Sequence, residues 1–123
     1  MAISKKNRRT LIHKGIKYLW WIIDEFDPYT GDSLLVTVAS EDKKFIVKYY
    51  INQAHNGRRF LTVIGPEFSC DTITGGVWKR FACPKFEEER IFKPKSVVKL
   101  IDWCLDPKLD KVEVDYLGKE VSQ

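Results

Sequence analysis

The sequence predicts an α+β domain that is mainly β: an antiparallel meander of five or six strands packed by one C-terminal amphipathic helix. The 123-residue chain is rich in aromatic residues, with four Trp, five Tyr and seven Phe. Aromatic and β-branched side chains favour the half-buried surface of a sheet. Apolar residues follow the strand period from Arg9 to Ile64, and then the helical period beyond Pro94.

Turn residues divide the first half of the chain into five predicted strands. The turns are Lys14-Gly15, Asp27–Asp32 with its Pro and Gly, Glu41-Asp42-Lys43, and a stretch that ends in Asn56-Gly57. Gly supplies a positive φ, and Asp can bond nearby backbone amides. The strands between these turns are Arg9–His13, Ile16–Asp24, Ser33–Ser40, Lys44–Ile51 and Arg59–Ile64. Short connections between consecutive strands favour a meander.

Alternation predicts which strand residues face the core. The run Ile16–Ile23 is apolar on both faces except at Lys17, as a central strand covered on both sides would be. The next strand places Leu34, Val36 and Val38 on one face. The strand after it groups four apolar side chains, which are Phe45, Val47, Tyr49 and Ile51.

In the second half of the chain, the spacing of apolar residues changes at Pro94. Residues 65–93 are less regular, with a predicted sixth strand at Val77–Ala82. A helical stripe then follows at Val97, Leu100, Ile101, Cys104 and Leu105. We expect the helix to begin at Ser96 or at the Lys93-Pro94 junction and to stop at Asp106-Pro107. A further short strand is possible within Lys111–Tyr116.

The chain is expected to form one domain over residues 1–123, with a basic N-terminal arm at 1–8 and a frayed tail at 118–123. No apolar run follows the basic start, so we expect no secretory signal. The longest apolar stretch, Tyr18–Ile23, is far shorter than the roughly 20 residues of a spanning helix. We therefore expect a cytoplasmic protein without membrane contact.

Motifs for catalysis, metals and cofactors are missing from the sequence. Three cysteines make an odd number, and neither they nor the isolated His13 and His55 have the spacing of a zinc site. Basic neighbours could lower the pKa of Cys83, but an inert thiol explains this residue better. We assign no catalytic, cofactor-binding or metal-binding residue, and expect no cofactor and no enzyme activity.

Charge is segregated along the chain, whose formal net charge is +4. Residues 1–17 carry six Lys or Arg and no acid, residues 18–42 carry six acids and no base, and residues 43–66 carry five bases and no acid. Opposite charges on neighbouring strands could pair with one another. Alternatively, the basic segments could form an edge that meets an acidic partner or a phosphate backbone.

Nucleic-acid binding is one hypothesis that follows from the basic segments 5–17 and 43–59. Aromatic side chains among cations can stack bases while the cations contact phosphates. The candidate phosphate contacts are Lys5, Lys6, Arg8, Arg9, Lys48, Arg58 and Arg59. The sequence contains no RRM, KH or helix-turn-helix signature, which disfavours this function.

Protein–protein interaction is the hypothesis we favour. One short helix is not enough to cover both faces of the predicted sheet, and an uncovered Trp or Tyr is a common interface anchor. The candidate interface residues are Tyr18, Trp20, Trp21 and Tyr50, although core packing is expected for at least two of the first three. The partner is expected to be another protein or a second copy of the chain. An enzyme built from dispersed residues is the least favoured alternative.

Two stretches resemble small uncharacterised bacterial proteins. These are the Tyr/Trp-rich hairpin Gly15–Trp21 and the strand-Pro-helix ending Ile91–Ile101. The resemblance implies a bacterial cytosolic protein but no activity, so no functional residue is carried over from it.

Overall fold

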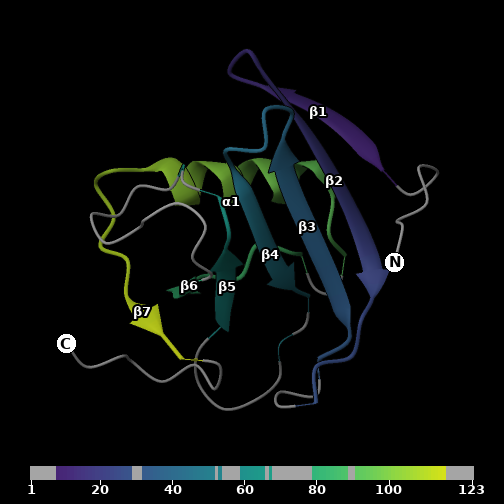
Figure 1. Ribbon diagram of the computed structural model, residues 1–123, viewed down its shortest axis with the longest axis vertical. Helices are drawn as coiled ribbons and strands as arrows, with labels where there is room; N and C mark the ends of the chain where they lie inside the picture. The colour runs from purple at the N-terminus through teal and green to yellow at the C-terminus, as the bar shows by residue number, and fades with distance from the viewer. Residues whose placement is uncertain are drawn as a thin grey trace.

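The sheet runs through the molecule in chain order. The computed structural model describes residues 8–28, 32–51, 53, 59–65, 67, 79–88 and 91–115. Its strands, all antiparallel, form one sheet in the order β1 to β7 (Figure 1). They are β1 (Arg9–His13), β2 (Ile16–Asp24), β3 (Leu34–Ser40), β4 (Ile46–Tyr50), β5 (Arg59–Val63), β6 (Lys79–Cys83) and β7 (Glu113–Val114), and the helix α1 (Pro94–Leu105) lies between β6 and β7 in sequence.

Two tight turns set the register of β1 with β2 and of β3 with β4. Lys14 and Gly15 both have positive φ, 52° and 79°, as the two-residue hairpin turn that matches strand twist requires. Between β3 and β4, the Asp42 carboxylate accepts hydrogen bonds from Ser40 Oγ at 2.6 Å and from the Lys44 amide at 3.0 Å. These bonds lower the pKa of Asp42, and they hold the turn at Lys43, whose φ is 63°.

One face of the sheet forms the core with α1. Trp20 lies opposite Val38, Val38 opposite Val47, and Tyr49 opposite Leu61, and all of these side chains are buried. The helix adds Val97, Leu100, Ile101 and Cys104 to the same cluster. In Figure 1 the strands β2 to β4 lie in front of α1, so the helix covers only the far side of the sheet in that view.

A proline and a hydrogen bond to a serine side chain stabilise the start of the helix. Pro94 occupies the first helical position, where its missing amide is no loss. Ser96 Oγ accepts a hydrogen bond from the Lys93 amide at 3.2 Å. Asp106 is extended at the other end, ahead of Pro107. Both expected boundaries of the helix are confirmed.

The predicted fold class is confirmed, with two differences in detail. The described residues form seven strands, because the short strand considered within Lys111–Tyr116 pairs with β6 as β7. The buried faces of β3 and α1 are also shorter than the spacing of their apolar residues predicts. Leu34 and Leu105, each at the end of its element, are about two-fifths exposed, at 39% and 36%. Residues 77–78, 89–90 and both predicted tails fall wholly or mainly outside the described residues.

Candidate interaction surface

The sheet face opposite α1 has no helix over it in the described parts of the chain, and we call it the open face. Strand alternation assigns its residues, because each pair in register points to the same side. Along β2 to β6 its larger side chains are Leu19, Trp21, Ile23, Ile46, Lys48, Tyr50, Phe60 and Arg80. Most of these are half-buried rather than fully covered. Leu35, Thr37 and Phe60 on this face are at most 6% exposed, so the half-buried residues make up its solvent-accessible part.

Cations and threonines form a row across the open face. Register places Trp21 opposite Thr37, Thr37 opposite Lys48, Lys48 opposite Thr62, and Thr62 opposite Arg80. The Arg8 guanidinium lies 5.1 Å from the centroid of the Trp21 ring and extends the row by one strand. Neighbouring strands are about 4.8 Å apart, so Lys48 and Arg80 stand roughly 10 Å from each other. We call these six residues the cationic row.

Apolar residues flank the cationic row on both sides. One flanking row runs Ile23, Leu35, Tyr50, and the other runs Leu19, Ala39, Ile46. The Trp21 indole Nε1–H is shielded from solvent and finds no acceptor within the described part of the chain. A partner lying on this face would thus meet a basic line between two apolar strips.

The electrostatics of the open face are polarised. Its charged residues within the described strands are all basic: Lys17, Lys48 and Arg80. Lys17 Nζ lies 3.4 Å from Glu41 Oε2, which neutralises that corner. At the opposite end, burial together with Glu25, Asp27 and Asp32 raises the pKa of Tyr50 to about 12. The other two of these three cations, Lys48 and Arg80, lie in the cationic row.

The structure divides the four candidate interface residues into two pairs. Tyr18 and Trp20 are 2% and 1% exposed and lie in the core, where Tyr18 meets Phe45 edge-on and Trp20 packs near Phe92. Their burial removes them from any surface in the folded protein. Trp21 and Tyr50 remain half-buried on the open face, where a partner could reach them.

The candidate phosphate contacts are divided as well. Arg8 and Lys48 belong to the cationic row. Arg9 points to the other side, where its guanidinium lies 5.1 Å from the Trp20 ring centroid, and Arg59 is paired with Glu87 on that side. Lys5, Lys6 and Arg58 are outside the described residues. The basic segments 5–17 and 43–59 therefore contribute to both faces of the sheet.

Sequence reasoning missed Arg80. The sequence predicts a strand at Val77–Ala82 but not its pairing, so it does not place Arg80 on the same face as Lys48. The alternation of Lys79–Cys83 holds the missing signal: once Phe81 is assigned to the core, Arg80 must point to the open face.

A buried polar cluster lies on the core side of the sheet. Tyr49 Oη donates to Glu87 Oε1 at 2.6 Å, and Arg59 Nη1 donates to Tyr49 Oη at 2.8 Å and to Glu87 Oε2 at 2.9 Å. Burial raises the pKa of the neighbouring Cys83 thiol, and Arg59 offsets only part of that rise. The thiol is therefore protonated at neutral pH, which does not suit a nucleophile.

A second charged contact joins the first hairpin to the helix. His13 Nε2 lies 2.7 Å from Asp102 Oδ1, and Lys14 Nζ lies 3.5 Å from the same oxygen. The hydrogen bond from His13 lowers the pKa of Asp102, although burial acts in the opposite direction. This contact ties the β1–β2 hairpin to α1.

No protein family model, curated protein or solved structure matches this chain. The resemblance to small bacterial proteins thus gains no support from these comparisons. Among the residues that the structure describes, no three His, Cys, Asp or Glu side chains gather as a metal site would require. Within the same residues, α1 falls short of the length and hydropathy needed to cross a bilayer.

Proposed function

We propose that the protein is a non-enzymatic interaction domain that binds an acidic protein surface through the open face. The cationic row is the observation that carries this proposal. It places Arg8, Lys48 and Arg80 on one side of the sheet, while the acidic residues of the described strands point elsewhere.

The composition of the open face favours a protein partner. Trp, Tyr and Arg dominate binding hot spots, and the cores of interfaces are poor in acidic residues and lysine. Trp21, Tyr50, Arg8 and Arg80 supply the first three residue types here, with apolar strips on either side. A partner could cover the strips while its carboxylates met the row.

Charge complementarity favours an acidic partner over a second copy of the chain. Two copies stacked through the open face would bring like charges together, and such a juxtaposition costs several kcal/mol. An acidic surface would instead be steered toward the row, with an association rate that falls as salt rises.

Single-stranded nucleic acid is the second candidate for the same face. The ring of Trp21 lies under Arg8, with Lys48 two strands away in the same row, and so combines a stacking surface with cations, as sequence-tolerant nucleic-acid surfaces do. The acids near Tyr50 weigh against it, because a phosphate backbone crossing that end of the sheet would be repelled.

Binding of two probes can separate the candidates. A synthetic peptide that alternates Glu and Phe represents an acidic protein strand, and oligothymidylate represents single-stranded nucleic acid. We expect the peptide to bind more tightly than oligothymidylate. Lys48→Glu and Arg80→Glu should each weaken the peptide at least about tenfold, because each reverses a charge in the row.

The matched control is Lys99→Glu, an exposed charge reversal on α1, which should leave the affinity unchanged. Tighter binding of oligothymidylate would assign the face to nucleic acid instead. Equal effects of the three reversals would show that only net charge matters. A dimer in sedimentation velocity that depends on Trp21 would replace the acidic partner with a second copy.

A further inference from the structure

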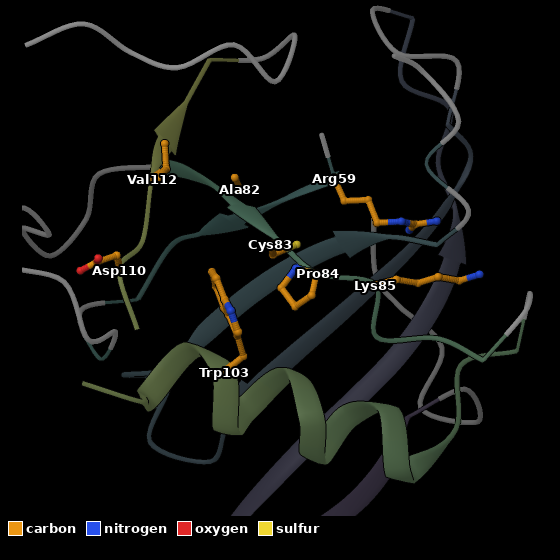
Figure 2. A pocket seen from close by; sticks show the side chains of 8 residues that line it. All are labelled: Arg59, Ala82, Cys83, Pro84, Lys85, Trp103, Asp110 and Val112. Carbon is orange, nitrogen blue, oxygen red and sulfur yellow. The ribbon is translucent and has the colours of Figure 1, made fainter. Parts of the chain in front are cut away.

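A pocket of about 520 Å³ opens between α1 and the ends of β5 and β6, on the side of the sheet that carries the core (Figure 2). Its volume falls in the range of small-molecule sites. Arg59, Pro84, Lys85, Trp103 and Asp110 contribute the side chains used below. The proposed binding of a protein on the open face does not involve them.

Arg59 is held in the pocket by its buried partners. Its contacts with Tyr49 and Glu87 both use Nη1, and the side chain of Glu87 is fully buried. Nε and Nη2 have no acceptor among the described residues. These two nitrogens form one edge of the planar guanidinium, and such an edge matches the two oxygens of a carboxylate.

Lys85 and Trp103 complete the binding features. Figure 2 shows the Arg59 and Lys85 side chains extending in the same direction, with the Trp103 ring rising from α1 toward Cys83 and Pro84. Two neighbours hold the Trp103 ring in place. The ring centroid of Phe86 lies 6.2 Å from that of Trp103, and Lys111 Nζ lies 5.2 Å from the Trp103 ring centroid. The pocket thus joins two cationic groups to an apolar wall.

The charges of the pocket select for a single negative charge. Glu87 already balances Arg59, so among the described residues Lys85 adds one positive charge without an ion-pair partner on this side. Asp110 lies at the opposite side of the pocket from Lys85 in Figure 2 and disfavours further negative charge there. A dianion such as phosphate would exceed the charge available.

We propose that this pocket binds a small monoanionic carboxylate with an apolar or aromatic body. The carboxylate lies on the Nε–Nη2 edge of Arg59 and near the Lys85 ammonium, and the body extends from there along Pro84 toward Trp103 (Figure 2). The planar guanidinium of Arg59 selects for the shape of a carboxylate, and the ammonium of Lys85 selects for its negative charge.

Benzoate is a suitable probe, since it carries one carboxylate on an aromatic ring. In ¹H–¹⁵N spectra of the whole chain, we expect benzoate to shift the Trp103 indole and Arg59 Nε signals in a saturable way. A dissociation constant on the order of 1 mM is expected for so small a ligand. Benzamide lacks the charge and acetate lacks the ring, so each should bind at least about tenfold more weakly.

Two variants test the proposed contacts. Lys85→Gln changes an exposed residue and should weaken benzoate about threefold or more. Arg59→Lys keeps a positive charge beside Glu87 but removes the planar edge, and should weaken benzoate about tenfold. Lys99→Gln, on an exposed position of α1, is the matched control and should have no effect. Urea unfolding of each variant shows that the comparison is made between folded proteins.

Three results would overturn the proposal. The first is the absence of a saturable shift at Trp103 and Arg59. The second is binding of benzamide or inorganic phosphate as tight as that of benzoate. The third is an unchanged benzoate affinity in both Lys85→Gln and Arg59→Lys. None of these bears on the open face, so this proposal and the protein-binding proposal fail separately.

Discussion

Glu87 illustrates how single residues in this fold depend on partners from distant parts of the chain. Its carboxylate is fully buried and is satisfied by the hydroxyl of Tyr49 and the guanidinium of Arg59, 38 and 28 residues away. A buried charge without such partners is strongly destabilising. No local pattern around Glu87 predicts these contacts, because the surrounding acidic run has the composition of an exposed turn.

The Tyr49 hydroxyl is expected to contribute measurably to stability. Tyr49→Phe keeps the ring but leaves Glu87 Oε1 without its 2.6 Å donor. We expect a loss of about 1–3 kcal/mol in the free energy of unfolding, measured by urea denaturation. The matched control is Tyr50→Phe on the open face, where a change within about 0.5 kcal/mol is expected at neutral pH. Equal losses in the two variants would show that the cluster has no special role.

Tyr50 gives the protein a predicted sensitivity to alkaline pH. Its pKa is raised from 10.0 to about 12 in the folded state, first by burial and then by three acids. The folded protein therefore keeps this proton where the unfolded chain has lost it. The resulting stability is fully present below about pH 10 and is lost as pH rises toward 12.

The test of this pH dependence compares two proteins at two pH values. Urea unfolding at about pH 9 and about pH 11 should show a decline in stability that is smaller in Tyr50→Phe than in the original chain. Tyr49 also has a raised pKa, so part of the decline remains in the variant. Identical declines in both proteins would contradict the assignment to Tyr50.

At the scale of elements, local periodicity was sufficient to place most strands and the helix. The group Phe45, Val47, Tyr49 and Ile51 is buried as alternation predicts, and the helical stripe is buried up to Cys104. Periodicity did not predict how far each face of β2 is buried. Its second face, with Leu19, Trp21 and Ile23, is apolar yet only half-buried, because one helix can cover one face only.

Gly65 marks a close approach between the end of β5 and the β3–β4 turn. A Cβ added there would press on the Lys44 carbonyl oxygen and lie 2.9 Å from the Ile46 amide nitrogen. Both neighbours are backbone atoms and cannot rotate away. Gly65→Ala is therefore expected to cost about 2–3 kcal/mol.

Gly15→Ala provides a comparison for this substitution. Gly15 has a φ of 79° but open space around its Cβ position, so only the conformational cost of about 1 kcal/mol applies. Chemical denaturation of both variants gives the two values. A smaller loss at Gly65 than at Gly15 would mean that the strand ends shift apart at little cost.

At the scale of the whole molecule, the two sides of one sheet have different roles. The side under α1 holds the core and the pocket at Arg59, whereas the open face holds the cationic row between apolar strips. The segregation of charge along the sequence predicted a basic surface without locating it. Its location depends on strand order and register, which bring Arg8, Lys48 and Arg80 together from three separate segments.

The contact between His13 and Asp102 shows the same limit of local sequence patterns. The two residues are 89 positions apart and meet because the β1–β2 hairpin folds back beside α1. Considered alone in the sequence, either residue is expected to be a solvated polar group. Only the packed sheet and helix bring them within hydrogen-bond distance.

The most direct test of the central claim maps where the acidic Glu-Phe peptide binds. In a ¹H–¹⁵N titration, we expect the largest shifts at the Trp21 indole and at the amides of Thr37 and Thr62, which lie in the cationic row. The amides of Val97 to Cys104 should remain in place, because α1 is on the other side. Shifts confined to α1 or to the Arg59 pocket, with Trp21 unmoved, would contradict the assignment of the open face as the binding surface.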